Sequence, residues 1–129
     1  MYNMAKFNDQ RFLIELDDNE IFVFGSNLEG KHIGGAAKQA FDHFGAIYGI
    51  GVGIQGQSYA IPTMPPLNLP MIGWYIAQFK EWARLTPDTT YYLTSIGTGI
   101  AGWLPEDFEL FYQDLPNNVI RIQSTITPL

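Results

Sequence analysis

The sequence of 129 residues has no cysteine, two histidines and little positive charge. Without cysteine, disulfides, thiolate metal ligands and a cysteine nucleophile are all excluded. Seven Lys and Arg residues against thirteen Asp and Glu residues leave a net charge of −6, which argues against binding of long nucleic acids through a general positive field. The histidines and acids show no metal-ligand spacing, so we expect no metal and no cofactor.

The sequence also lacks a long apolar run and an N-terminal targeting segment. No stretch approaches the length of a bilayer crossing, and no charged segment leading into an apolar one opens the chain. We therefore expect a cytoplasmic protein with no membrane partner. Hydrophobic residues make up 47% of the chain and aromatic residues 15%, which is enough for one domain over residues 1–129 with its own core. The oligomeric state stays open.

The most informative stretch begins at Ile21 and reads IFVFGSNLEGKHIGGAAKQAFDHFG. Its first four residues are all apolar, the pattern of a strand buried on both faces of a parallel sheet. The first loop, Gly25–Gly35, contains four glycines. A strand, a glycine-rich loop and a helix together present free backbone N–H groups and a positive dipole end to an anion. The alternative interpretation is an ordinary strand-to-helix turn that is rich in glycine by chance.

Three helices are predicted from apolar spacing and helix-ending residues. The first covers Ala36–Phe44 and stops at Gly45, the second has Pro70 in its first turn, and the third opens at Pro105 and ends at Pro116. The predicted buried faces are Ala37, Ala40, Phe41 and Phe44 in the first helix; Leu69, Ile72, Ile76, Phe79 and Ala83 in the second; Phe108, Phe111, Tyr112 and Leu115 in the third. Trp74 and Trp82 flank the second face and are expected to serve packing.

Strands are predicted at Ser58–Ile61, Tyr91–Ile96 and Val119–Thr125, while Arg11–Leu16 fits a short strand or a helical turn. Residues 46–57 alternate glycine with large side chains, which favours a loop or a strand pressed by another backbone. Strands that alternate with helices indicate an α/β domain, with helices covering a mixed, mostly parallel sheet.

A second glycine-rich loop, Ser95–Trp103, also follows a predicted buried strand. Ligands of open α/β sheets bind at the carboxyl ends of strands, so the two loops are expected to form two walls of one cleft. The second loop offers an anion the N–H groups of Gly97, Thr98, Gly99 and Ile100 and the hydroxyls of Ser95 and Thr98. The sequence patterns GxxxxGK[ST] and GxGxxG are both absent, which argues against a P-loop triphosphatase and a Rossmann dehydrogenase.

Both loops resemble those of macro domains. Phe24–Ala37, FGSNLEGKHIGGAA, is similar to the first ligand loop of that family. Ser95–Pro105, SIGTGIAGWLP, resembles the second, a Ser-x-x-Thr-Gly-x-x-Gly-aromatic-x-Pro sequence that wraps a diphosphate. The resemblance implies a three-layer α/β/α sandwich that binds ADP-ribose or a related NAD-derived nucleotide. No counterpart is matched for the Asp with which macro domains read the adenine amino group.

Carried over to this sequence, the resemblance implies that Asn27 holds the distal ribose and that Trp103 packs near the far end of the ligand. Gly34–Ala36 would line the ribose and the adjacent phosphate, and Gly97–Ala101 would cradle the diphosphate. The implied ligand-binding set is Gly25, Ser26, Asn27, Gly34, Gly35, Ala36, Ser95, Gly97, Thr98, Gly99, Ile100, Ala101 and Trp103. For Asn27, the alternative is a side chain that only caps a turn.

Several functions remain open at this point. The leading hypothesis is a binding module for ADP-ribose or a related nucleotide. A hydrolase of ADP-ribosyl linkages would need a positioned water or a general base, for which Glu29 and His32 are the only candidates in the loops. A protein that sequesters a cyclic ADP-ribose-type signalling nucleotide is a third possibility, and a purely structural α/β domain is a fourth.

Overall fold

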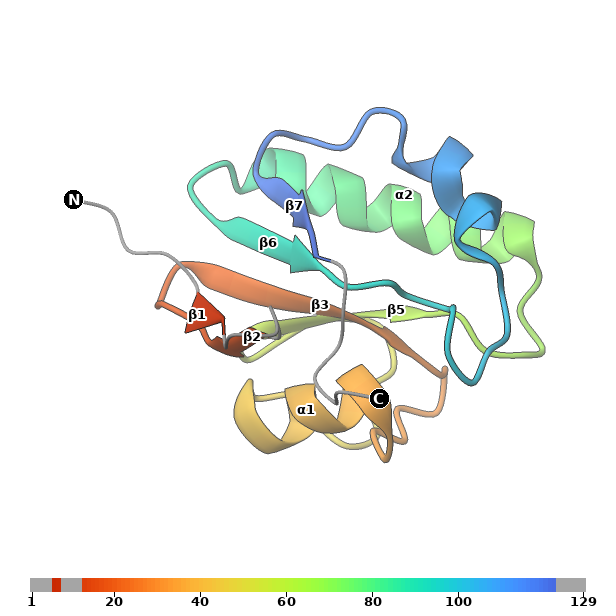
Figure 1. Ribbon diagram of the computed structural model, residues 1–129, viewed down its shortest axis with the longest axis horizontal. Coiled ribbons are helices and arrows are strands. Elements are labelled where there is room, and N and C mark those ends of the chain that lie inside the picture. Colours follow the sequence, from red (N-terminus) through yellow and green to blue (C-terminus); the bar gives the residue numbers. More distant parts are fainter. Residues whose placement is uncertain (1–5, 8–12, 123–129) are drawn as a thin grey trace.

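The computed structural model describes residues 6–7 and 13–122 (Figure 1). Five of its strands form one mixed sheet in the order β4-β5-β3-β6-β7. These are β3 (Glu20–Ser26), β4 (Gly53–Gln55), β5 (Ser58–Pro62), β6 (Thr90–Leu93) and β7 (Val119–Arg121). The β3–β5, β3–β6 and β6–β7 pairs are parallel, and β4–β5 is antiparallel. The prediction of an α/β protein with a mixed, mostly parallel sheet is confirmed.

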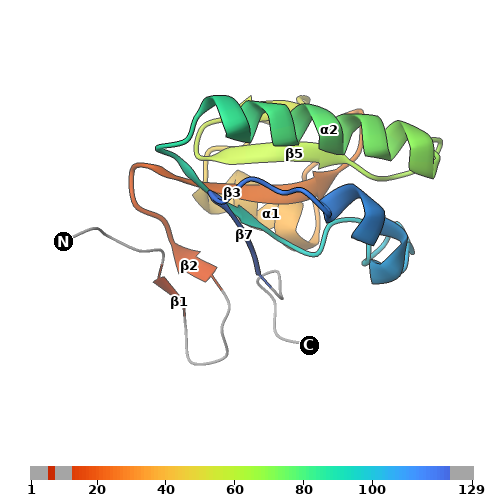
Figure 2. The ribbon, with the colours of Figure 1, turned by 90° about the horizontal axis from the view of Figure 1, so that it is seen from above.

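The strand β3 is buried on both faces, as its apolar run predicts. Alternate side chains of a strand point to opposite faces. Ile21 and Val23 enter the core beneath α2 (Leu69–Leu85), whereas Phe22 and Phe24 enter the core beneath α1 (Gly35–His43). Figures 1 and 2 show the two helices on opposite sides of the sheet.

The helix α1 covers its side of the sheet with small residues. Ala36, Ala37 and Ala40 are buried against the phenylalanines of β3. The expectation that Phe41 shares this face is wrong, because Phe41 is 46% exposed. Its ring lies instead at the outer edge of the helix, with its centroid 6.4 Å from that of Tyr48.

The helix α2 buries Ile72, Ile76, Phe79 and Ala83, which confirms the predicted face. Its first turn is capped by Asn68, whose side-chain oxygen accepts a hydrogen bond from the backbone N–H of Met71 at 3.0 Å. The expectation that Trp74 and Trp82 serve packing is met only in part: the Trp74 ring packs edge-on against Tyr75, with centroids 5.1 Å apart, but neither indole enters the core. Their side chains are 59% and 39% exposed, on a side of the helix turned away from the sheet.

The predicted third helix is a 3₁₀ helix, η1 (Pro105–Tyr112), in which Phe108 is buried in the core. Its winding is tighter than that of an α-helix, as in the 3.0 Å bond from the N–H of Asp107 to the carbonyl of Leu104. Two short strands near the N-terminus, β1 (Lys6–Phe7) and β2 (Leu13–Glu15), pair antiparallel in a separate sheet. Of the two alternatives for Arg11–Leu16, a short strand or a helical turn, the structure shows the strand. Residues 11 and 12 lie outside the described part.

Two strands end earlier than predicted. The strand β6 stops at Leu93, and the next residue, Thr94, donates both its N–H and its hydroxyl to the carbonyl of Val23, at 3.1 and 2.8 Å. The strand β7 stops at Arg121, and residues 123–125 of the predicted strand lie outside the described residues. Within residues 6–7 and 13–122, no helix is both long and apolar enough to cross a bilayer.

Residues 46–57 lie directly against the backbone of the first loop. A Cβ atom on Gly51 would meet the carbonyl oxygen of Asn27 and lie 2.7 Å from that of Leu28. A Cβ on Gly30 would lie 2.7 Å from the carbonyl carbon of Ile50. The expectation of a segment pressed by another backbone is confirmed, with only Gly53–Gln55 forming a strand.

We expect Gly51→Ala to lower the free energy of unfolding by about 1–3 kcal/mol, because the added methyl group forces two backbone segments apart. Gly99→Ala is the matched control, since a Cβ at Gly99 meets nothing within 4 Å. Its unfolding free energy should stay within about 0.5 kcal/mol of the wild type. Urea unfolding measures both, and equal stability of the two variants would contradict the close backbone contact.

Candidate functional site

The two glycine-rich loops leave the same edge of the sheet, because β3 and β6 are adjacent and parallel. At Gly25, a Cβ would lie 3.2 Å from the backbone nitrogen of Gly97. At Gly34, a Cβ would lie 3.9 Å from Cδ1 of Ile100. The first and second loops therefore run side by side at the carboxyl ends of the strands, and that they form two walls of one cleft stays a prediction.

The first loop is closed by hydrogen bonds of its own side chains. The Asn27 side-chain oxygen accepts from the N–H of Lys31 at 2.9 Å, and its amide nitrogen donates to the carbonyl of Lys31 at 3.2 Å. The turn-capping role of Asn27 is thus present, and each end of the amide keeps one further bonding position for a ligand. Ser26 is buried, and its hydroxyl donates to the carbonyl of Gly51. These bonds hold the loop in a fixed shape.

His32 is buried at 2% exposure and packs edge-on against Phe24, with ring centroids 5.2 Å apart. Its Nε2 lies 3.0 Å from the carbonyl of Ile50 and 3.3 Å from Oε1 of Gln55. The Gln55 amide is oriented by the N–H of Ile47, which donates to Oε1, and by Nε2, which donates to the Ile50 carbonyl. Both neighbours of the His32 Nε2 are acceptors, so this nitrogen carries the proton in the neutral ring.

The other catalytic candidate, Glu29, is exposed. Its carboxylate lies 3.6 Å from Nζ of Lys31, a solvent-exposed pair. Such a pair contributes little to stability. Glu29 and His32 do not form a hydrogen-bonded pair with each other, and His32 uses Nε2 to hold residues 50 and 55 in place. The geometry therefore offers no oriented acid and base within the first loop as described.

The N-terminus of α1 has no capping side chain. Gly34, at the N-cap position, has an extended backbone with φ −154° and ψ 158°, and no acidic residue lies in the first turn. The N–H groups of Gly35, Ala36 and Ala37 donate to no acceptor within the described residues. These groups and the helix dipole together favour an anion at this position.

The second loop has a similar surplus of donors. The N–H of Gly102 bonds the carbonyl of Gly99 at 3.0 Å, and that of Trp103 bonds the carbonyl of Gly97 at 2.9 Å. Among residues 6–7 and 13–122, no acceptor bonds the five N–H groups of Gly97–Ala101. Gly99 faces open space, and the side chain of Ile100 is 87% exposed. Donors of both loops therefore lie on adjacent segments, although Gly97 itself is buried.

Two further residues of the predicted ligand-binding set, Thr98 and Trp103, hold the second loop in place through side-chain hydrogen bonds. The indole Nε1 of Trp103 donates to the carbonyl of Thr63 at 2.8 Å, and the ring packs on the core beneath α2. The hydroxyl of Thr98 donates to the carbonyl of Ser95 at 2.9 Å. Trp103 therefore positions the loop relative to the end of β5, and a contact of its ring with a ligand stays a prediction.

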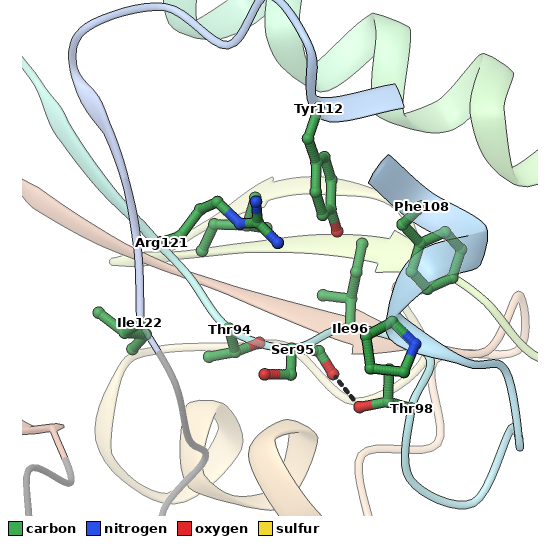
Figure 3. A pocket seen from close by; sticks show the side chains of 10 residues that line it. Thr94, Ser95, Ile96, Thr98, Phe108, Tyr112, Arg121 and Ile122 are labelled. Atoms are coloured by element: carbon green, nitrogen blue, oxygen red, sulfur yellow. Dashed lines mark hydrogen bonds between the residues drawn. The ribbon is translucent and has the colours of Figure 1, made fainter. Parts of the chain in front are cut away.

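A cavity of about 310 Å³ lies on the far side of the second loop, between β6, β7 and η1. Figure 3 shows the Tyr112 hydroxyl and the Arg121 guanidinium among the side chains around it. The Arg121 guanidinium carbon lies 4.8 Å from the centroid of the Tyr112 ring, and Nη1 lies 3.2 Å from the Glu109 carboxylate. Burial raises the pKa of Tyr112, so its hydroxyl stays protonated at neutral pH.

Sequence reasoning missed this cavity. Of the predicted site residues, only Ser95 and Thr98 line it. The sequence predicts Tyr112 on an apolar helix face and Arg121 within a strand. A charge in the middle of the predicted strand Val119–Thr125 was the available signal. Within the described part of the chain, no group of three or more His, Asp or Glu side chains is arranged to hold a metal ion.

No protein-family model, no curated protein and no solved structure matches this chain. The site is therefore defined by the geometry of its own residues.

The arrangement around His32 predicts a specific tautomer. In long-range ¹H–¹⁵N correlation spectra above the titration range of the ring, we expect Nε2 to show a protonated, pyrrole-like shift and Nδ1 a pyridine-like shift. The reason is that Nε2 faces two acceptors, whereas Nδ1 has no partner in the described residues. His43, which is exposed at the end of α1, serves as the control ring in the same spectrum. The reverse assignment for His32 would contradict the network.

Proposed function

We propose that this protein binds ADP-ribose or a related NAD-derived nucleotide through the two glycine-rich loops. The observation that carries the proposal is the set of N–H groups at Gly35–Ala37 and Gly97–Ala101 that find no acceptor among residues 6–7 and 13–122, on segments that lie next to each other. Donors fixed in the backbone need no reorganisation to meet a diphosphate, and the dipole of α1 adds to their effect. The sequence resemblance to the macro-domain loops supports the same ligand class.

The net charge of −6 is compatible with an anionic ligand if the ligand is bound by backbone N–H groups. Interactions between exposed charges fade beyond about 10 Å at 0.1 M salt. Backbone N–H groups act at hydrogen-bond distance, so they determine the local potential seen by a phosphate. The binding should accordingly depend less on salt than that of a protein which uses surface lysines.

The remaining groups suggest how the rest of the ligand is held. In this proposal the Asn27 amide bonds the distal ribose through the donor and acceptor positions that Lys31 leaves open. Gly34 lets that ribose approach the start of α1. The cavity beside the second loop shares Ser95 and Thr98 with it and accepts one end of the nucleotide. The placement of α1 and α2 on opposite faces of the sheet supports a macro-domain-like, three-layer arrangement.

We propose binding rather than hydrolysis. A hydrolase needs a base that can reach a water at the scissile bond. Glu29 is exposed and paired with Lys31, and His32 holds the backbone of a neighbouring segment through Nε2. Sequestering of a cyclic ADP-ribose-type nucleotide uses the same donors and remains within the proposal.

The test uses Gly99, because it has an ordinary φ and faces open space. We expect Gly99→Glu to melt like the wild type and to lose detectable binding of ADP-ribose in calorimetry. A carboxylate among the N–H groups takes the place of the phosphates and repels them, by about 4 kcal/mol at 4 Å and an effective dielectric constant near 20. Gly99→Ala is the control for the loss of glycine itself and should bind with no more than a tenfold weaker affinity.

Gly102 is unsuitable for the same test, since its φ of +79° strains any side chain there. The proposal is contradicted if Gly99→Glu and the wild type bind ADP-ribose equally well, because the diphosphate then lies elsewhere. It is also contradicted if the folded wild type binds neither ADP-ribose nor its cyclic forms.

A further inference from the structure

The helix α2 carries a second apolar stripe, which we call the outer stripe: Met71, Trp74, Gln78, Trp82 and Leu85. Four of its side chains are large and apolar, with exposures of 48% for Met71, 59% for Trp74, 39% for Trp82 and 71% for Leu85. At 3.6 residues per turn, the five positions fall within about 80° of the helix circumference. They therefore form one narrow line along the helix.

The outer stripe is separate from both surfaces that α2 already uses. The sheet takes Ile72, Ile76, Phe79 and Ala83. The 3₁₀ helix η1 takes another side, where Lys80 donates to the carbonyl of Phe111 at 2.8 Å and a Cβ on Gly73 would lie 2.5 Å from Cε1 of the Phe111 ring. Figure 2 shows α2 as the outermost layer on its side of the sheet.

The outer stripe is symmetric about Gln78. Trp74 and Trp82 lie four residues to either side of it, and Met71 and Leu85 lie seven residues to either side. Two copies of such a helix, packed antiparallel about a two-fold axis at Gln78, bring Trp74 beside Trp82 of the partner subunit. The same operation brings Met71 beside Leu85 of the partner subunit. An isologous interface needs this kind of self-complementary surface.

We propose that the outer stripe is a homodimer interface, with a second copy of this chain as its occupant. With about 250 Å² for a whole tryptophan side chain, Trp74 and Trp82 together expose about 250 Å². Met71 and Leu85 add a similar area, so that complete burial of these four side chains in two copies removes about 1,000 Å² in total from water, the lower bound for a specific interface. The flanks of the helix add to this value.

Charge also fits a contact between identical helices. The outer stripe contains no charged residue, with the amide Gln78 at its centre. The nearest charges on one flank, Glu81 and Arg84, pair with each other at 2.9 Å within the same chain. Packing two stripes together therefore buries no unpaired charge, which would otherwise oppose association. Two Gln78 side chains at the axis can bond each other through their amides.

The absence of cysteine from the chain allows a direct test. In Gln78→Cys, the introduced thiols of two copies face each other at the axis, and mild oxidation should give a covalent dimer in high yield. In Ala77→Cys, the thiol lies about 100° around the helix and should give little dimer. Gln78 and Ala77 are both exposed, so neither variant disturbs the core. Equal crosslinking of the two variants, or none in either, overturns the interface.

Sedimentation of the intact chain provides the second readout. The wild type should show a concentration-dependent dimer, while Trp74→Glu and Trp82→Lys should each sediment as folded monomers. Mixing these two variants should restore association, because the Glu introduced at residue 74 meets the Lys introduced at residue 82 and the opposite Trp pair is intact. A wild type that stays monomeric at high micromolar concentration overturns the proposal and leaves another macromolecule as the occupant. Failure of the mixture to associate overturns the antiparallel register.

Discussion

The structure depends on the burial of β3 from both sides. Phe22 and Phe24 make one face of that strand and Ile21 and Val23 the other, and all four are buried. A strand covered on both faces accepts parallel neighbours, and here β5 and β6 provide them. Because β3 and β6 run in the same direction, the loops that follow them meet at one edge. The position of the candidate site is thus a consequence of the core.

The first loop is held by backbone contact rather than by large side chains. Gly30 and Gly51 bring residues 27–30 and 49–51 together without intervening Cβ atoms, and the hydroxyl of Ser26 bonds across the same contact. His32 and Gln55 close it from the other side. A loop fixed in this way loses little conformational freedom when a ligand binds, which favours affinity. The backbone donors at its end, at the start of α1, are consequently preorganised.

Much of this could be predicted from the sequence, because it rests on local patterns. The apolar run of β3, the spacing of the buried face of α2 and the glycines of both loops are visible in short windows. The exposure of Phe41, Trp74 and Trp82 was not predicted. Helical spacing identifies the side chains that face the core. Whether the side chains beside that stripe are also buried depends on which distant segments of the chain pack over them.

The same limit applies to the site. The order of the chain gives no sign that His32 meets residues 50 and 55, or that Asn27 bonds Lys31 with both ends of its amide. Tyr112 and Arg121 line the same cavity only because β7 pairs with β6. That pairing depends on the topology of the whole sheet. Contacts between distant segments become predictable only when the topology is known.

A titration with ADP-ribose, followed in ¹H–¹⁵N spectra of the wild type, tests residue by residue whether backbone N–H groups of both loops bind this ligand. We expect the largest amide shifts to occur together at Gly97–Ala101 and Gly35–Ala37, with smaller shifts at residues lining the cavity near Tyr112. Shifts confined to other elements, or no shifts at saturating ligand, would contradict it.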